Sequence, residues 1–416
     1  MTTKAAGSEK KGTPWLTGVM VFVFVMTPLL GYLAQLGFAP LMALAGLLVL
    51  PAMGRPRAPA APTLILLLLA IWAAFSMTWS PAAPPPGSLK DYGDVEKVTA
   101  VKLFLQLALY GAAAAAALRL SARGADRVAT VMGFGVLALA VFVGVDALTG
   151  AAMFQKFRVL SGDPIRPDLA KVKISIGCYV MAVMFWPAAA ALARRGKQAA
   201  VVLLLAGVLT ASVLASADSC LVALAAGGVV WLLVKGLGKA GGRLLTLAIA
   251  IPFMVAPIAV LWAIQTGFWG WLHGLVPPSW DARLNIWAFA ADHIQDHPFR
   301  GWGLDASRTF GDAIPLHTHN AQLQLWLELG AVGAALAGAF FCWLAHGVTR
   351  AAETDRGGAA MSGAALTSYL VVGALSFGVW QEWWIAVGAL AVVACASVRL
   401  SSGEYSSELV EISPNG

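Results

Sequence analysis

The chain has 416 residues, of which 59% are hydrophobic and 12% are charged, and its formal net charge is +7. Soluble domains carry about 25% charged residues, so this composition excludes an ordinary soluble protein and predicts a polytopic membrane protein. The positive charge is accounted for by Lys and Arg in the connecting segments, so nothing supports nucleic-acid binding.

Apolar runs that are long enough to cross a bilayer recur along the chain. A membrane-spanning helix needs about 20 mostly apolar residues. All four cysteines lie inside such runs, so the sequence implies neither a disulfide framework nor a zinc site. Twelve spans are predicted, at 15–32, 34–53, 61–79, 98–119, 126–149, 172–193, 198–215, 218–234, 243–266, 321–346, 361–380 and 383–399.

Basic residues alternate between the connections as the positive-inside rule requires. If the N-terminus with Lys4, Lys10 and Lys11 is cytoplasmic, every second connection is basic too. Both termini are then inside, and the largest loop is outside. The predicted organisation is a cytoplasmic tail at 1–14, nine spans within 15–266, an outside loop at 267–320, three spans within 321–400 and a cytoplasmic tail at 401–416.

Eleven basic residues nevertheless fall on the predicted outer side. Such an electropositive face suits a phosphate- or pyrophosphate-bearing lipid, and arginine matters most because its fork matches phosphate oxygens. For any single Lys, a solvated charge or a contact with anionic headgroups is the alternative. The eleven are Lys90, Lys97, Lys102, Lys156, Arg158, Arg166, Lys171, Lys173, Arg283, Arg300 and Arg308.

Within the outside loop, residues 281–296 have the pattern of a helix, with Asp281 as the N-cap. Arg283 lies on the apolar stripe of this helix, so it is expected to face protein or the membrane interface. A buried-facing arginine at the water boundary needs an anion, although a snorkelling side chain is the alternative. The stripe consists of Arg283, Trp287, Ala290 and Ile294.

The loop ends in Leu316-His317-Thr318-His319-Asn320. Asn320 is predicted to cap the following helix, which puts His319 at the positive end of that helix. The helix dipole disfavours imidazolium, so His319 is expected to stay neutral and able to accept a proton. His317 is expected to face solvent, with substrate contact as the alternative.

A histidine–carboxylate metal site is a rival interpretation, because His293 and His297 are four residues apart and have acidic neighbours. Pro298 is expected to end the helix at His297, so neither a metal nor another cofactor is predicted.

Four acidic residues on the outer side are expected to line one cavity or to pair with the external cations. They are Asp146, Asp218, Glu328 and Glu382, of which Asp218 and Glu382 are candidate substrate-binding residues.

Three pieces of sequence together resemble the O-antigen ligase and polymerase superfamily. They are Arg283-x-x-x-Trp287, His297-Pro298-Phe299-x-Gly301-x-Gly303, and His319-Asn320-x-x-Leu323-x-x-x-x-Glu328-x-Gly330. The resemblance implies an all-α inner-membrane protein of about twelve helices, similar to GT-C-type membrane glycosyltransferases, with short helices in a large periplasmic loop. It also implies metal-independent transfer of an undecaprenyl-pyrophosphate-linked glycan to a sugar hydroxyl of the lipid A core.

The resemblance also implies residue roles. His319 and Arg283 match the family's essential histidine and loop arginine, and Arg158 and Arg166 match a basic segment after the fifth span. Asn320 would orient the histidine or cap its helix. Many members carry a Ser-Arg pair where this chain has Ala217-Asp218, so the role of that arginine is either absent or supplied by another cation, with Arg158 and Arg166 as the candidates.

Three alternatives remain. An O-antigen polymerase would use the same chemistry on another acceptor, as would a protein O-oligosaccharyltransferase, a type that usually has more chain beyond its last spans. A transporter would place ionisable residues near the middle of the membrane, whereas here they gather at the outer edge.

Overall fold

The computed structural model describes residues 13–53, 61–85, 87–88 and 98–402. All regular structure in these residues is helical. The tail residues before 13 and after 402, together with Lys90 and Lys97, lie outside the described residues. The long helices are α1 (Thr13–Leu33), α2 (Phe38–Met53), α3 (Ala61–Ser76), α5 (Thr99–Ala117), α6 (Ala122–Leu148), α8 (Pro167–Arg194), α9 (Gln198–Leu214), α10 (Asp218–Leu237), α11 (Lys239–Gln265), α14 (Ala321–Ala351), α15 (Arg356–Leu375) and α16 (Glu382–Ser401).

Each predicted span corresponds to one of these helices. Ten are long and apolar enough to cross a membrane, with α2 counted together with the preceding 3₁₀ turn η1 (Gln35–Gly37). The other two, α3 and α9, are apolar but shorter, with 16 and 17 residues. The chain is therefore an all-α polytopic membrane protein, as predicted. Boundaries differ by up to five residues, as they do at both ends of α15 and at the end of α14. Helix α8 begins five residues before the predicted 172 because Pro167 takes its first turn. Proline is favoured there because its fixed φ suits a helix start and its missing N–H is not needed.

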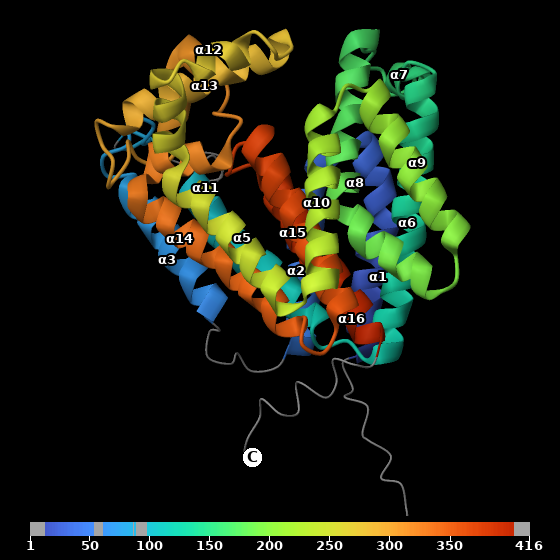
Figure 1. Ribbon diagram of the computed structural model, residues 1–416. Coiled ribbons are helices and arrows are strands. Elements are labelled where there is room, and N and C mark those ends of the chain that lie inside the picture. Colours follow the sequence, from blue (N-terminus) through green and yellow to red (C-terminus); the bar gives the residue numbers. More distant parts are fainter. Residues whose placement is uncertain (1–12, 54–60, 86, 89–97, 403–416) are drawn as a thin grey trace, which may run out of the picture. The chain divides into compact units, whose positions relative to one another are not determined.

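Two compact units make up the chain. Unit 1 contains Met1–Arg57, Leu109–Ala217 and Ala386–Gly416, and unit 2 contains Ala58–Ala108 and Asp218–Ile385. In unit 1, α6 packs against α1, α8 and α9 (Figure 1). Glycines let these helices approach closely: a Cβ on Gly177 would lie 2.7 Å from the carbonyl oxygen of Gly31, and one on Gly207 would lie 2.8 Å from that of Ala140. Small residues at crossings are the usual means of packing membrane helices.

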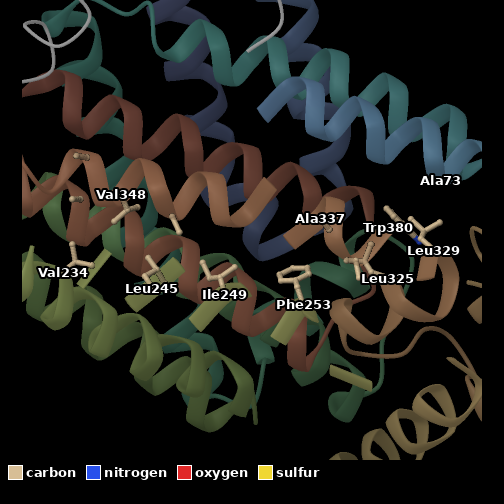
Figure 2. Packing of buried hydrophobic residues seen from close by; sticks show 14 of the residues in the cluster. Ala73, Val234, Leu245, Ile249, Phe253, Leu325, Leu329, Ala337, Val348 and Trp380 are labelled. Carbon is tan, nitrogen blue, oxygen red and sulfur yellow. The ribbon is translucent and has the colours of Figure 1, made fainter. Parts of the chain in front are cut away.

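In unit 2, α14 packs against α3, α11 and α15, and α10 packs against α15. Figure 2 shows the buried side chains between these helices, from Val234 and Val348 to Leu325, Leu329 and Trp380. Trp380, in the turn between α15 and α16, belongs to this core. The core therefore extends up to the segment that carries the candidate site.

The predicted outside loop contains two helices, α12 (Phe268–His273) and α13 (Pro278–Ile294), beyond the end of α11 (Figure 1). The 3₁₀ turns η2 (Ala306–Thr309) and η3 (Gly311–Ala313) follow. The predicted N-cap at Asp281 is wrong, because α13 begins three residues earlier with Pro278 in its first turn. Asp281 instead pairs with Nδ1 of His273 at 2.5 Å, which ties α12 to α13.

Candidate functional site

The site is built at the start of α14. Oδ1 of Asn320 accepts a hydrogen bond from the backbone N–H of Leu323 at 2.9 Å, so the predicted N-cap is confirmed. With this cap, α14 begins at Ala321, and His319 lies just outside the helix. His319 has a φ of 53°, a left-handed conformation that is uncommon for residues other than glycine. The surrounding contacts hold its imidazole in this position.

The imidazole of His319 has a defined tautomer. Its Nδ1 lies 2.8 Å from the backbone carbonyl oxygen of Ser376, which can only accept, so Nδ1 carries the proton. Burial lowers the pKa of His319, the bond to Ser376 opposes that shift, and the charge of Arg283 lowers the pKa further. The lowered pKa agrees with the expected neutral state, but its main cause is burial and not the helix dipole. Nε2 keeps a lone pair that can accept a proton.

His317 is buried, with 6% of its surface exposed, so the expectation that it faces solvent is wrong. Its Nδ1 accepts the backbone N–H of His319 at 3.1 Å, which leaves the proton of the neutral ring on Nε2. That Nε2 lies 2.9 Å from Nε2 of Gln381. Because an amide nitrogen cannot accept the proton, the amide of Gln381 must be turned by 180° so that its oxygen takes this place. Burial lowers the pKa of His317 to about 3, with the nearby charges of His319, Arg308 and Arg283 adding to the effect.

Two arginines surround the histidines with positive charge. Arg283, on α13, is half-buried, and its guanidinium carbon lies 5.1 Å from the centroid of the Trp280 ring. Arg308, in η2, has its Nε 3.4 Å from Oδ1 of Asp305. The charges of both arginines lower the pKa of His317, and that of Arg283 also lowers the pKa of His319. Sequence reasoning selected Arg283 but counted Arg308 only among the external cations.

Trp287 connects α13 to the histidine segment. Its Nε1 donates to the backbone carbonyl oxygen of Thr318 at 2.9 Å. Arg283 and Trp287 are one turn apart, so α13 presents both toward the same segment. The predicted stripe is confirmed further along the helix, where Ala290 and Ile294 are buried. The Arg-x-x-x-Trp spacing thus places a cation near His319 and holds the segment next to it.

The remaining motif pieces pack on each other. Gly330 has a φ of 64° and a ψ of −165° and interrupts α14, and across this break the backbone N–H of Ala331 donates to the carbonyl oxygen of Pro298 at 2.8 Å. A Cβ on Gly301 would lie 2.3 Å from the carbonyl oxygen of Glu328, and one on Gly330 would lie 2.3 Å from that of Phe299. Only glycine allows backbones to approach this closely.

The other candidate residues are one exposed carboxylate and three charged side chains that form ion pairs. Asp218 is exposed at the start of α10, and Glu382 pairs with Lys102 at 2.8 Å. Arg158 and Arg166 belong to unit 1, where they pair with Asp163 and Asp168 respectively.

Two acidic residues expected to line a cavity are fully buried instead. Asp146 accepts hydrogen bonds from the backbone N–H groups of Met153 and Phe154, in the first turn of the short helix α7 (Ala152–Leu160), and therefore caps that helix. Glu328 is enclosed by hydrogen-bond donors in unit 2.

The two histidines of the rival metal interpretation make aromatic contacts. The ring of His293 stacks on Phe289 with centroids 3.8 Å apart, and that of His297 meets Trp302 edge-on at 4.6 Å. Within the described ranges, no group of three or more His, Cys, Asp or Glu side chains could hold a metal ion.

Residues 199–338 match the family model described as O-Antigen ligase, and this range includes Arg283 and His319. The chain is 26% identical over 238 residues to a protein of Rickettsia conorii that is named as a candidate polysaccharide ligase, with 54% of this chain and 57% of the relative covered. A similarly named protein of Rickettsia typhi is 26% identical over 228 residues, with 51% and 55% covered. The aligned region spans little more than half the length of these relatives. The expected resemblance is confirmed: residues 199–338 are similar to the O-antigen ligase family.

Proposed function

We propose that this protein is an O-antigen ligase. It transfers O-antigen polysaccharide from undecaprenyl pyrophosphate to a sugar hydroxyl of the lipid A core, at the periplasmic face of the bacterial inner membrane. The observation that carries the proposal is a neutral histidine of fixed tautomer, His319, in the electrostatic field of Arg283. A proton acceptor beside a cation that can bind phosphate is what glycosyl transfer from a pyrophosphate requires.

In the proposed step, the acceptor hydroxyl oxygen attacks the anomeric carbon of the donor sugar and its proton passes to Nε2 of His319. The bond between the anomeric carbon and the pyrophosphate oxygen breaks, and its electron pair stays on the pyrophosphate. A single displacement of this kind inverts the anomeric centre. Removing one contact that stabilises the developing charge typically costs about 2.7–4 kcal/mol of barrier.

Arg283 and Arg308 are the arginines that we assign to the departing pyrophosphate. The positive charges of both arginines lower the pKa of His317, which lies in the same unit of the chain. Arg158 and Arg166 are weaker candidates, because the arginine charges that lower the pKa values of His317 and His319 are those of Arg283 and Arg308. Arg308 would then supply the cation that many members of the superfamily resembled by this sequence carry at the position of Asp218. Because guanidinium groups balance the charge in this scheme, we infer that transfer needs no metal ion, and assaying the purified protein with a chelator tests this.

Deletion of the gene tests the function. Loss of long-chain lipopolysaccharide, with finished polymer accumulating on the carrier, supports a ligase. Accumulation of single repeat units on the carrier points to a polymerase. An unchanged lipopolysaccharide with loss of protein-linked glycan points to a protein O-oligosaccharyltransferase. His319→Ala should reproduce the deletion phenotype while the protein still reaches the membrane, and full activity of this variant would refute the mechanism.

A further inference from the structure

Glu328 is a fully buried carboxylate that the proposed reaction does not use. It lies on α14, nine residues beyond His319 in the sequence. Its Oε1 accepts a hydrogen bond from Nε2 of Gln324 at 3.0 Å. Its Oε2 accepts from the backbone N–H of Asp305 at 2.9 Å and from Nε1 of Trp380 at 2.6 Å. Both oxygens therefore act only as acceptors, which is a role that an ionised carboxylate performs best.

One side of this network holds the turn between α15 and α16. Trp380 binds Glu328 directly, and the backbone N–H of Val379 donates to Oε1 of Gln324 at 3.0 Å. The same turn supplies Ser376, whose carbonyl oxygen accepts from His319. It also supplies Gln381, which contacts His317. The contacts of Ser376 and Gln381 with the two histidines are thus made by a segment that Glu328 and Gln324 tie to α14.

The other side holds the loop before η2. The backbone N–H of Asp305 binds Glu328, and Arg308 follows three residues later. The neighbouring N–H of Gly303 donates to the carbonyl oxygen of Glu328 at 2.7 Å. One residue of α14 therefore connects the segment that orients the base with the segment that carries a cation.

We propose that Glu328 is a positioning residue, whose carboxylate fixes the turn that orients the imidazole of His319 and the loop that carries Arg308. This inference rests on the proposed function. The carboxylate itself is required because three donors converge on its two oxygens. In Glu328→Gln, one of the two carboxylate oxygens becomes an NH₂ group, which must then face either the NH₂ of Gln324 or the N–H groups of Asp305 and Trp380. Two donors would then point at each other. The amide of Gln324 cannot turn to relieve that clash, because its oxygen already accepts from Val379.

A double substitution restores every hydrogen bond with the same number of charges. In Glu328→Gln with Gln324→Glu, the NH₂ of residue 328 donates to one carboxylate oxygen of residue 324, and the other oxygen still accepts from Val379. The amide oxygen of residue 328 accepts from Asp305 and Trp380. A matched control is Glu353→Gln, the same substitution near the far end of α14, where Glu353 forms a surface ion pair with Lys239 at 2.7 Å.

The experiment uses the full chain in nanodiscs, with carrier-linked glycan from the deletion strain as donor and the unextended lipopolysaccharide of that strain as acceptor. Misplacing a catalytic group by about 1 Å costs about 100-fold. Glu328→Gln should therefore lower kcat by about 100-fold with little change in KM for the donor, and the double variant should recover most of kcat. Glu353→Gln should match the wild type.

The outcomes separate this inference from the proposed function. Full activity of His319→Ala would refute the proposed function, whatever Glu328→Gln does. If His319→Ala is inactive while Glu328→Gln keeps the wild-type kcat, only the positioning role is refuted. The positioning role is also refuted if the double variant melts at the wild-type temperature but its kcat stays as low as that of the single variant. Recovery of kcat in the double variant supports the positioning role, because a loss due only to a missing charge at residue 328 would persist.

Discussion

The Nδ1–H of His319 donates to the backbone carbonyl oxygen of Ser376 at 2.8 Å, across 57 positions of sequence. This bond places the lone pair of the imidazole on Nε2, and burial keeps the ring neutral. A histidine held in this way can act as a base without first losing a proton to solvent.

The pH dependence of transfer should follow from this state. Because the pKa of His319 is lowered from the ordinary value of 6.5, the base stays unprotonated at pH 6.5 and is lost only as pH falls further. The acidic limb of kcat/KM should therefore lie below pH 6.5. A pH profile of the purified protein measures this. An acidic limb at or above pH 6.5 would contradict His319 as a base with a lowered pKa.

His317 should make the folded protein sensitive to acid. Its pKa of about 3 lies below the unfolded value of 6.5, so between these values the unfolded chain binds a proton that the folded chain does not. Stability is therefore lost as pH falls below 6.5, by about 3 kcal/mol at pH 4. His317→Asn keeps an acceptor for the backbone N–H of His319 but cannot titrate. Melting temperatures from pH 7 to pH 4 should fall more steeply for the wild type than for this variant; parallel curves would exclude His317 as the cause.

Arg308→Ala should slow transfer more than Arg158→Ala does. One charge-stabilising contact is worth about 10²–10³ in kcat, and we expect Arg308 to supply such a contact. Arg158 is not among the arginines whose charges act on His317 and His319, so its removal should change kcat by less than about tenfold. Turnover of both variants, at equal membrane levels, makes the comparison. The opposite order would assign the second cation to the segment around Arg158.

Gly301→Ala should prevent normal folding. Gly301 has a φ of 69°, and a Cβ there would lie 2.3 Å from the carbonyl oxygen of Glu328. The strained φ alone costs about 1–2 kcal/mol, and backbone atoms cannot move aside as a flexible side chain can. The membrane level and the melting temperature should both fall. Gly347→Ala is the matched control, because a Cβ there meets nothing within 4 Å, and it should behave as the wild type. Normal stability of Gly301→Ala would show that the Gly301–Glu328 contact is dispensable.

Local sequence was sufficient for most of the fold. A run of about 20 apolar residues must be helical in a bilayer, since every backbone N–H and C=O has to be satisfied within the segment. For this reason each of the twelve predicted runs coincides with a helix. The Asn320 cap was also predicted correctly, because it joins residues only three positions apart. Errors arose where a local signal competed with another one, as when Pro278 rather than Asp281 set the start of α13.

The sequence by itself determined the helices, the histidine segment and the presence of external arginines. The tertiary structure alone decided which groups meet there: Ser376 with His319, Gln381 with His317, and Glu328 with Trp380. No periodicity relates residues that are tens of positions apart, so the burial of His317 and the location of Arg308 could not be inferred from their neighbours. Hydrophobic length and capping act within a few residues, whereas tautomer, burial and electric field are set by whichever distant segments pack against a side chain.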